Sequence, residues 1–225
     1  FHTVPAWIGA KSVVTIHDVS FSAMPHLFPW KVRVYLEMML RRALAQATHI
    51  ISISNFTANE LMRIFHVPAR RISVVHHGSE APKEVSEAQG GDEIRRAVGL
   101  KDPYFLFFDG PNPRKNLALL IDLLRVAPED WLNRFQFVVT GPAIETAEAF
   151  KTAGLGKWVN DRIITPGFLP DQKLDALYQE ARALLYLSHY EGFGLPILEA
   201  FARRCPVISL RASCLPEIAG DAAYF

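Results

Sequence analysis

The sequence predicts an α/β protein made of two doubly wound domains, and three observations lead to this prediction. Short apolar runs rich in β-branched residues alternate with stretches of helical length. The runs are apolar throughout, which is typical of parallel strands that helices cover on both faces. One segment rich in Gly, Pro, Ser and charged residues, at positions 78–91, interrupts the alternation as a linker between domains would.

The expected elements fall into two blocks, one on each side of this segment. In the first block we expect strands at residues 12–16, 50–53 and 72–75, a helix at 30–47, and a second helix that Asn55 caps and that runs to Phe65. In the second block we expect strands at 104–108, 135–140, 162–165, 184–187 and 207–210, and helices at 116–126, 145–152, 172–181 and 196–203. The predicted organisation is a first domain over residues 1–79, a linker over 80–91 and a second domain over 92–225.

Composition argues against several classes of protein. The 225 residues are 50% hydrophobic and 21% charged, as in ordinary globular proteins, and the formal net charge of +1 gives no nucleic-acid signature. No apolar run approaches the roughly 20 residues that span a bilayer. Cys205 and Cys214 lack metal-ligand neighbours in the sequence and fit buried thiols in a reducing compartment. His76 and His77, as neighbours on a strand, would point to opposite faces, so we expect no metal site.

The most specific pattern is the string EGFGLPILEA at residues 191–200. A turn bracketed by glycines leads into a helix that Pro196 can open, because Pro is well tolerated in the first turn of a helix. The backbone amides of Phe193, Gly194 and Leu195 would then lie at the helix N-terminus, where a phosphate binds readily.

Two carboxylates flank this turn. Glu191 precedes the helix and Glu199 lies about one turn inside it, so they can accept hydrogen bonds from different hydroxyl groups of one ligand. A lone pair of glutamates at this spacing is more often two solvated side chains. The complete ten-residue string is much more specific and favours a binding site.

Two adjacent cations, Arg114 and Lys115, follow the strand at 104–108 and precede the helix that begins near Asn116. Cations at a helix start oppose the helix dipole unless an anion is bound there. Arg offers a fork for phosphate oxygens and Lys a point charge. A solvated basic loop is the common alternative, but with the two glutamates downstream the sequence favours a phosphate site.

Residues at two other strand ends are further candidates. His17 and Asp18 end the first strand, where a histidine that structures the turn competes with a histidine that contacts a ligand. Phe168 and Leu169 follow another strand, where a hydrophobic turn is the alternative. Ligands of parallel α/β sheets bind beyond the carboxyl ends of the strands, so both pairs lie where a site is expected.

Together these motifs resemble those of the retaining glycosyltransferases of GT-B type, the group 1 or family-four class, which have two Rossmann-like domains facing a cleft. The resemblance covers nearly the whole chain, and its motifs stand in the family's order. They are TIHD (15–18), IS (53–54), VHHG (75–78), PRKN (113–116), GFL (167–169), SHYEGFGLP (188–196) and LPEIAG (215–220). The resemblance implies this fold with an incomplete N-terminal domain and the last helices missing, so we expect a chain truncated at both ends.

The resemblance also implies roles for individual residues. Arg114, Lys115 and the amides of residues 193–195 would bind the diphosphate of a sugar nucleotide. Glu191 would bind hydroxyls of the transferred sugar, and Glu199 would hold the ribose.

Four further residues receive roles in the same way, and a fifth is left open. His17 would touch the transferred sugar or stabilise the reaction centre, and Asp18 would orient the imidazole or contact the acceptor. Phe168 and Leu169 would lie near the nucleotide base. Glu217 matches a recurring position of the family, with a structural role at a helix start as the alternative.

The implied reaction transfers a hexosyl group from a nucleoside-diphosphate sugar to a hydroxyl of a glycan or lipid-linked acceptor, with retention of configuration. The PRKN form favours mannose or a related hexose. No second carboxylate is placed as a nucleophile, unlike in a retaining glycosidase, so the leaving phosphate would accept the acceptor's proton on the front face. We expect no cofactor and no metal, because the cations stabilise the leaving group.

Two other functions stay open: a sugar-nucleotide epimerase of the same architecture, and a sugar-nucleotide-binding module without turnover. A nicotinamide-dependent enzyme is disfavoured because no G-x-G string continues as G-x-G-x-x-G, and no P-loop motif is present.

The helix at 30–47 carries Lys31, Arg33, Arg41 and Arg42 among Trp, Leu and Met residues. Such a basic amphipathic helix can lie on an anionic membrane, although the sequence favours a domain helix with a basic solvent face. We therefore expect a cytoplasmic protein, with peripheral contact of the N-terminal domain with the inner face of the membrane as a further expectation.

Overall fold

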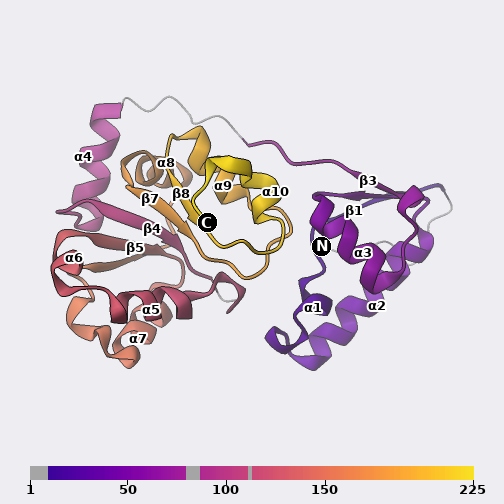
Figure 1. Ribbon diagram of the computed structural model, residues 1–225, viewed down its shortest axis with the longest axis horizontal. Helices are drawn as coiled ribbons and strands as arrows, with labels where there is room; N and C mark the ends of the chain where they lie inside the picture. The colour runs from indigo at the N-terminus through magenta and orange to yellow at the C-terminus, as the bar shows by residue number, and fades with distance from the viewer. Residues whose placement is uncertain (1–9, 80–86, 111–112) are drawn as a thin grey trace. The chain divides into compact units, whose positions relative to one another are not determined.

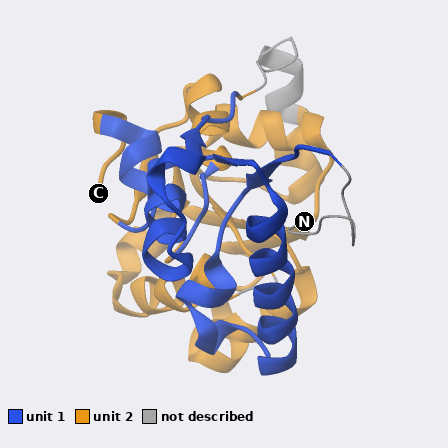
Figure 2. Ribbon diagram, turned by 90° about the vertical axis from the view of Figure 1, so that its right-hand side faces the viewer, with its two compact units in different colours: residues 1–78, 190–194, 212–220 blue, residues 79–189, 195–211, 221–225 orange. Residues whose placement is uncertain are grey.

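In the computed structural model, the described residues are 10–79, 87–110 and 113–225, with side chains described from Glu93 onward in the second range (Figure 1). The chain forms two compact units (Figure 2). Unit 1 consists of residues 1–78, 190–194 and 212–220. Unit 2 consists of residues 79–189, 195–211 and 221–225.

Unit 1 is built on a parallel sheet whose strands lie side by side in chain order: β1 (Val13–Ile16), β2 (His49–Ser52) and β3 (Ile72–Val74). Its helices are α1 (Ser20–Ala23), α2 (Trp30–Gln46), α3 (Asn55–Phe65) and α10 (Leu215–Ala219). Its core contains fully buried side chains from β1, α2, β2 and α3, namely Ile16, Leu40, Ile50 and Leu61. The core therefore fixes the carboxyl end of β1 relative to the first turn of α3.

Unit 2 is built on a parallel sheet with the strand order β6-β5-β4-β7-β8. The strands are β4 (Tyr104–Phe108), β5 (Gln136–Thr140), β6 (Ile163–Gly167), β7 (Ala183–Tyr186) and β8 (Val207–Ser209). The helices are α4 (Glu87–Val98), α5 (Leu117–Val126), α6 (Glu129–Arg134), α7 (Ala143–Phe150), α8 (Asp171–Glu180) and α9 (Leu195–Ala202). A strand order that does not follow the chain order marks a doubly wound sheet.

Helices cover both faces of this second sheet. Phe107 of β4 packs in one core cluster with Leu120 of α5. Tyr104 of the same strand lies an odd number of residues away and donates a hydrogen bond from its hydroxyl to Leu177 O of α8, at 2.8 Å. Because successive side chains of a strand point to opposite faces, α5 and α8 lie on opposite sides of the sheet. This burial on both faces explains why the strand sequences are predominantly apolar and do not alternate with polar residues.

The structure confirms the predicted α/β fold with parallel strands, and every predicted strand corresponds to an observed one. Short turns of 3-10 helix occur at Pro25–Leu27, Ala69–Arg71, Pro113–Lys115, Gly156–Trp158 and Gly220–Ala222, and a π turn at Lys151–Leu155. The small helices α1, α6 and α10 were not predicted. Each is too short for an apolar periodicity to be recognised in the sequence.

Two local predictions differ from the structure. The cap of α3 is Ser54 rather than Asn55: Ser54 has extended backbone angles and accepts a hydrogen bond from Thr57 N at 3.0 Å, whereas Asn55 is the first helical residue. Residues 87–91 of the predicted linker begin α4, and its remaining residues, 80–86, lie outside the described residues.

The contacts also group two short segments, 190–194 and 212–220, with unit 1, although both follow the predicted linker by many residues. Unit 1 is therefore assembled from three separate stretches of chain. The site described below shows which bonds bring these stretches together.

Candidate functional site

The segment 190–194 packs tightly on the carboxyl end of β1. A Cβ atom added at Gly192 would overlap the carbonyl oxygen of His17 and would lie 2.9 Å from Cβ of Asp18. Backbone atoms cannot rotate away as a flexible side chain can, so only glycine fits here. The first glycine of the EGFG string is therefore required for a close approach of two main chains.

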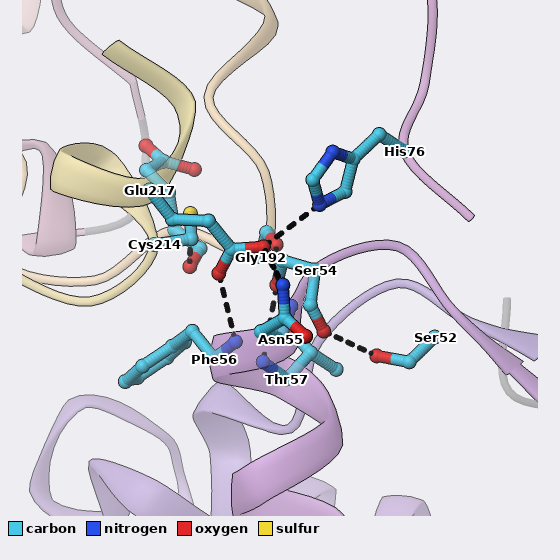
Figure 3. Close-up of polar contacts among 10 residues, drawn as sticks. Ser52, Ser54, Asn55, Phe56, Thr57, His76, Gly192, Cys214 and Glu217 are labelled. Atoms are coloured by element: carbon cyan, nitrogen blue, oxygen red, sulfur yellow. Dashed lines mark hydrogen bonds and ion pairs between the residues drawn. The ribbon is translucent and has the colours of Figure 1, made fainter. Parts of the chain in front are cut away.

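The hydroxyl of Ser54, the residue that caps α3, also binds Gly192 (Figure 3). Ser54 Oγ donates to Gly192 O at 2.7 Å while it accepts from Thr57 N at 3.0 Å, so one buried hydroxyl both caps α3 and binds the segment. The ring of Tyr190 packs edge-on against Phe56, with centroids 5.2 Å apart. The segment is thus fixed to the first turn of α3.

The backbone of Glu191 is held by the segment 212–220. Its N–H donates to Ser213 Oγ at 3.0 Å, and its carbonyl accepts from Cys214 Sγ at 3.1 Å. Burial raises the pKa of Cys214 to about 12, so the thiol stays protonated and remains a donor at neutral pH. Glu191 itself is buried, at 6% exposure. Both backbone groups of this predicted sugar-binding residue are therefore fixed by hydrogen bonds.

Glu217 joins the same segment to the N-terminus of α3 (Figure 3). Oε1 accepts from Asn55 N at 2.7 Å, from Asn55 Nδ2 at 3.0 Å and from His76 Nε2 at 2.8 Å, and Oε2 accepts from Phe56 N at 2.9 Å. The first N–H groups of a helix lack partners within the helix and favour negative charge. Of the two roles considered for Glu217, the structure therefore supports the structural one, at the start of α3.

These bonds also determine how Glu217 titrates. Burial alone would raise the pKa of Glu217, but the hydrogen bonds from Asn55, Phe56 and His76 together outweigh burial and lower the pKa below its usual value. The folded state therefore binds a proton at Glu217 less readily than the unfolded chain does.

Two histidines lie against Phe193, and a third stacks on one of them. The rings of His17 and His77 stack with centroids 5.6 Å apart, and Phe193 lies 5.2 Å from the ring of His77 and 5.8 Å from that of His76. Partial burial, and then the neighbouring His77, lower the pKa of His17, so its imidazole is neutral at pH 7. The Phe193 side chain is buried in unit 1, and its backbone N–H is the part that the sequence assigns to a phosphate.

His76 and His77 lie beyond the end of a strand. Strand β3 ends at Val74, so the predicted alternation of their side chains between opposite faces of a strand does not apply. The two rings make different contacts: His76 bonds Glu217, and His77 stacks on His17. Among the described residues no group of three or more His, Cys, Asp or Glu side chains could hold a metal ion.

Asp18 has a structural task that the sequence did not indicate. Its Oδ1 accepts from Ser20 N at 3.0 Å and from Ser20 Oγ at 2.8 Å, which fixes the turn between β1 and α1. The predicted contacts of Asp18 with the imidazole and with an acceptor stay predictions.

In unit 2 the predicted cations lie in a loop at the carboxyl end of β4. Arg114 and Lys115 form a 3-10 turn with Pro113, and Arg114 O accepts from His189 N at 2.8 Å. Asn116 then caps α5 and donates to Leu187 O at 3.1 Å. The loop after β4 is therefore bonded to the loop after β7, so the cations are held close to that neighbouring strand end.

Two tyrosines contact the predicted ligand-binding side chains of unit 2: Tyr186 contacts Lys115, and Tyr178 bonds Glu199. Lys115 Nζ lies 5.2 Å from the ring centroid of Tyr186, a cation–π geometry. Glu199 lies on α9, which begins at Leu195, and its Oε2 accepts from the Tyr178 hydroxyl at 2.9 Å. Burial raises the pKa of Tyr178 far above its usual value, so the phenol remains a donor.

The start of α9 agrees with the sequence prediction. Gly194 has φ of +93°, a left-handed conformation that glycine adopts without strain, and Pro196 lies in the first turn. At the carboxyl end of β6, Phe168 follows Gly167 and is 78% exposed, and Leu169 is half-buried. Since β4, β6 and β7 are parallel, their loops share one edge of the sheet.

The structure thus separates the predicted site residues into two groups. Unit 1 contains His17, Asp18, Glu191, Phe193 and Gly194, and unit 2 contains Arg114, Lys115, Phe168, Leu169, Leu195 and Glu199. From the sequence, no supporting role was assigned to Ser213, Cys214 and Tyr178, and Ser54 was recognised only as part of the motif at 53–54. Only Ser54 carried a local signal, as a residue type that commonly caps helices. Cys205 and Cys214 are both buried and free, as expected.

Comparison with known proteins identifies the family. The family model described as "Glycosyl transferases group 1" matches residues 92–224, which is more than half of the chain, and the model described as "Glycosyltransferase Family 4" matches residues 1–81. The chain belongs to the group 1 glycosyltransferases. The resemblance to the group 1 and family-four glycosyltransferases read from the sequence motifs is confirmed.

Curated relatives of this glycosyltransferase include two named mannosyltransferases. "O-antigen chain mannosyltransferase B" of Escherichia coli is 32% identical over 94% of the chain and 56% of its own length. "O-antigen chain mannosyltransferase RfbU" of Salmonella typhimurium is 23% identical over 100% of the chain and 58% of its own length. The chain spans about half the length of these relatives.

Solved structures show the fold of the glycosyltransferase chain. WaaG, described as a glycosyltransferase involved in lipopolysaccharide biosynthesis, matches with a TM-score of 0.71 and 16% identity over 92% of this chain and 58% of its own. Anabaena HepE in complex with UDP and glucose matches with a TM-score of 0.69 and 20% identity, over 92% of this chain and 55% of the HepE chain. The chain therefore has the GT-B fold. Among the described residues, no helix has both the length and the apolar content to cross a bilayer.

Replacing Gly192 with Ala should destabilise the protein by about 1–3 kcal/mol, because the new Cβ meets the main chain at His17. A thermal melt measures the effect. The control is Gly78→Ala in the same unit, where an added Cβ meets no atom within 4 Å. This variant should have the melting temperature of the parent. Equal melting temperatures for Gly192→Ala and the parent would show that residues 190–194 do not pack on β1.

Glu217→Gln should lower the free energy of unfolding at pH 7 by about 1 kcal/mol, the usual value of a charge at a helix N-terminus. Because the folded pKa of Glu217 is lowered, its contribution is present above the unfolded pKa and is lost as the pH falls through the folded pKa. Denaturant titrations at several pH values should show the parent and the variant converging in acid. Glu148→Gln, at an exposed position, is the control, and a pH-independent difference for Glu217→Gln would contradict the assignment.

Proposed function

We propose that the protein containing this chain transfers a hexosyl group, with mannosyl as the leading candidate, from a nucleoside-diphosphate sugar to an acceptor hydroxyl with retention of configuration. The observation that carries the proposal is the set of groups at the carboxyl edge of the unit 2 sheet. Two cations, the first turn of α9 and an oriented carboxylate gather at strand ends that are bonded to each other. The mannosyltransferase names of the relatives support the choice of sugar.

The diphosphate would be bound by Arg114, Lys115 and the amides of residues 193–195. The positive end of α9 and two permanent cations suit the two phosphates, and they stabilise the charge that develops on the leaving group. Glu199 would accept hydrogen bonds from the ribose hydroxyls. Its bond from Tyr178 keeps the carboxylate in one orientation and so reduces the entropy lost on binding.

The transferred sugar would meet Glu191 and His17. Because both backbone groups of Glu191 are hydrogen-bonded, its main chain would not need to move for the carboxylate to accept from sugar hydroxyls. A neutral His17 can donate to or accept from a hydroxyl without adding charge near the developing oxocarbenium ion. Asp18 would contact the acceptor or orient His17, and Phe168 and Leu169 would lie against the base, for which the exposed Phe168 ring offers an apolar surface.

The reaction would take place on one face of the sugar. The bond from C1 to the diphosphate oxygen breaks, the bond from C1 to the acceptor oxygen forms on the same side, and the acceptor's proton passes to the leaving phosphate. No covalent glycosyl-enzyme and no metal ion are needed in this scheme, because Arg114, Lys115 and the α9 amides neutralise the leaving group.

The acceptor would be a glycan or a lipid-linked glycan, and the protein would work in the cytoplasm with peripheral contact to the inner face of the membrane. The O-antigen names of the relatives and the lipopolysaccharide role stated for WaaG support this class of acceptor.

The activity test uses the whole protein, including any residues that its gene encodes beyond these 225. The protein is incubated with a glycan acceptor and with the guanine and uracil nucleotides of mannose, glucose and galactose in turn. NMR of the product should show transfer with retained anomeric configuration, undiminished by a chelator. A product with inverted configuration would overturn the proposed mechanism. Loss of activity in the presence of a chelator would overturn the metal-free scheme. An epimerised donor would indicate an epimerase, and binding without turnover a binding module.

The two carboxylates should differ in what they bind. Calorimetry should show that Glu199→Gln lowers the affinity of the protein for free nucleoside diphosphate by roughly 10- to 100-fold, because the hydrogen bonds to the ribose are lost. Glu191→Gln should leave that affinity unchanged and lower kcat instead, since it meets only the sugar. Glu145→Gln, an exposed glutamate of α7, is the control. Equal nucleotide affinities for Glu191→Gln and Glu199→Gln would refute the division.

A further inference from the structure

The Tyr178 phenol that bonds Glu199 belongs to a largely buried polar cluster between α8 and α9. Asp175 and Tyr178 lie three residues apart on α8. Glu199 of α9 and Arg203, just beyond the end of that helix, lie four residues apart. Side chains at these spacings lie on one face of a helix. Because α8 packs against α9, the two pairs meet, and all four residues belong to unit 2.

Arg203 contacts each of the other three members of the cluster. Its Nε donates to Asp175 Oδ1 at 2.8 Å, and Nη2 forms an ion pair with the same oxygen. Its Nη1 donates to the carbonyl oxygen of Glu199 at 3.0 Å. Its Cζ lies 5.6 Å from the ring centroid of Tyr178, a cation–π geometry. One guanidinium group therefore holds both the main chain at Glu199 and the ring that bonds its carboxylate.

The stability of the fold does not require this cluster. The side chains of Arg203 and Asp175 are each 9% exposed, and the cost of removing two charges from water can exceed the attraction between them. Apolar side chains of the same volume often stabilise a fold as well or better. They could not supply a directed donor at both ends of Glu199, as the guanidinium does at its carbonyl and the phenol at its carboxylate.

The phenol leaves part of the Glu199 carboxylate open to a ligand. A carboxylate has about four lone-pair sites on its two oxygens, and the Tyr178 hydroxyl bonds Oε2 at 2.9 Å. The Tyr178 ring is 1% exposed, so it cannot follow the carboxylate if that group rotates, whereas Glu199 itself is only half-buried. The carboxylate is therefore held in one orientation and keeps acceptor sites for hydroxyl groups of a ligand.

We propose that Tyr178 and Arg203 are positioning residues that make the site selective for a nucleotide with both ribose hydroxyls, because they hold Glu199 ready to accept from the 2′- and 3′-hydroxyl groups. The inference rests on the proposed function, in which Glu199 binds the ribose. A mobile glutamate would lose side-chain freedom when it binds the two hydroxyls, whereas an oriented one loses little. The preference for a ribonucleotide should thus depend on Tyr178 and Arg203, although neither needs to touch the ligand.

The test compares, by calorimetry, the affinities of the whole protein, with any residues that its gene encodes beyond these 225, for a ribonucleotide and for its 2′,3′-dideoxy analogue. The probe is guanosine or uridine diphosphate, whichever the parent binds more tightly. The parent should prefer the ribonucleotide by roughly 10- to 100-fold. Tyr178→Phe, which keeps the ring, should lower the affinity for the ribonucleotide about 3- to 10-fold and leave that for the analogue unchanged. Arg203→Lys, which keeps the charge but loses the planar fork, should do the same.

A second buried phenol in unit 2 provides the matched control. The Tyr104 hydroxyl donates to Leu177 O at 2.8 Å, and Arg95 Cζ lies 5.9 Å from the ring centroid of Tyr104. This pair has the same chemistry, but its phenol bonds a backbone carbonyl and not a predicted ligand-binding carboxylate. Tyr104→Phe and Arg95→Lys should therefore keep the parent's preference for the ribonucleotide. The melting temperature of every variant is measured beside the two affinities.

A purely structural role for Tyr178 and Arg203 predicts a different result. Their variants would then melt at a lower temperature and either keep the parent's ratio of the two affinities or bind both nucleotides equally more weakly, and either result would overturn the inference. Loss of the preference in the control variants would also overturn it.

Glu199→Gln separates the inference from the proposed function. If Glu199→Gln loses the preference for the ribonucleotide while Tyr178→Phe and Arg203→Lys keep it, Glu199 binds the ribose and the inference alone is wrong. If Glu199→Gln keeps the preference of the parent, the assignment of Glu199 to the ribose is wrong, and the inference fails with it.

Discussion

The close approach of two main chains at Gly192 is the constraint on which the candidate site depends. The segment 190–194 can lie on the carboxyl end of β1 only because residue 192 has no side chain. Ser54 then holds the carbonyl of Gly192 and caps α3 with the same hydroxyl. Because Glu191 precedes this glycine, the position of its main chain follows from a backbone packing contact made by its neighbour.

The supporting bonds around the site come from stretches of chain that are distant in sequence. Residues 213–217 reach back to Glu191 and to the first turn of α3, and the loop after β7 is bonded to the cation loop after β4. The main chains of Glu191 and of the cation loop are thus held by groups outside the set of residues predicted to bind the ligand. Such supporting groups keep a site in its productive geometry and reduce what binding must reorganise.

The sequence predicted the strands and most of the long helices because apolar periodicity records burial directly. It missed α4, whose first turns contain Gly90 and Gly91 and so share the composition of a linker; the helix packs on α8, a tertiary effect that local composition does not reveal. Ser54 and Asn55 are both capping residue types, and the choice between them depends on where the helix begins. Ser213 and Cys214 gave no signal, because their role arises only when the chain returns to Glu191.

The groups that hold the segment around Glu191, and the one that bonds the carboxylate of Glu199, share a chemical property. Ser54, Ser213, Cys214 and Tyr178 are neutral hydrogen-bond donors, and burial raises the pKa values of the thiol and the phenol far above neutrality. Glu217, which anchors the same segment, changes charge only in acid. These supporting groups therefore keep one charge state near neutrality, so none of them would contribute a step to a pH–rate profile recorded there.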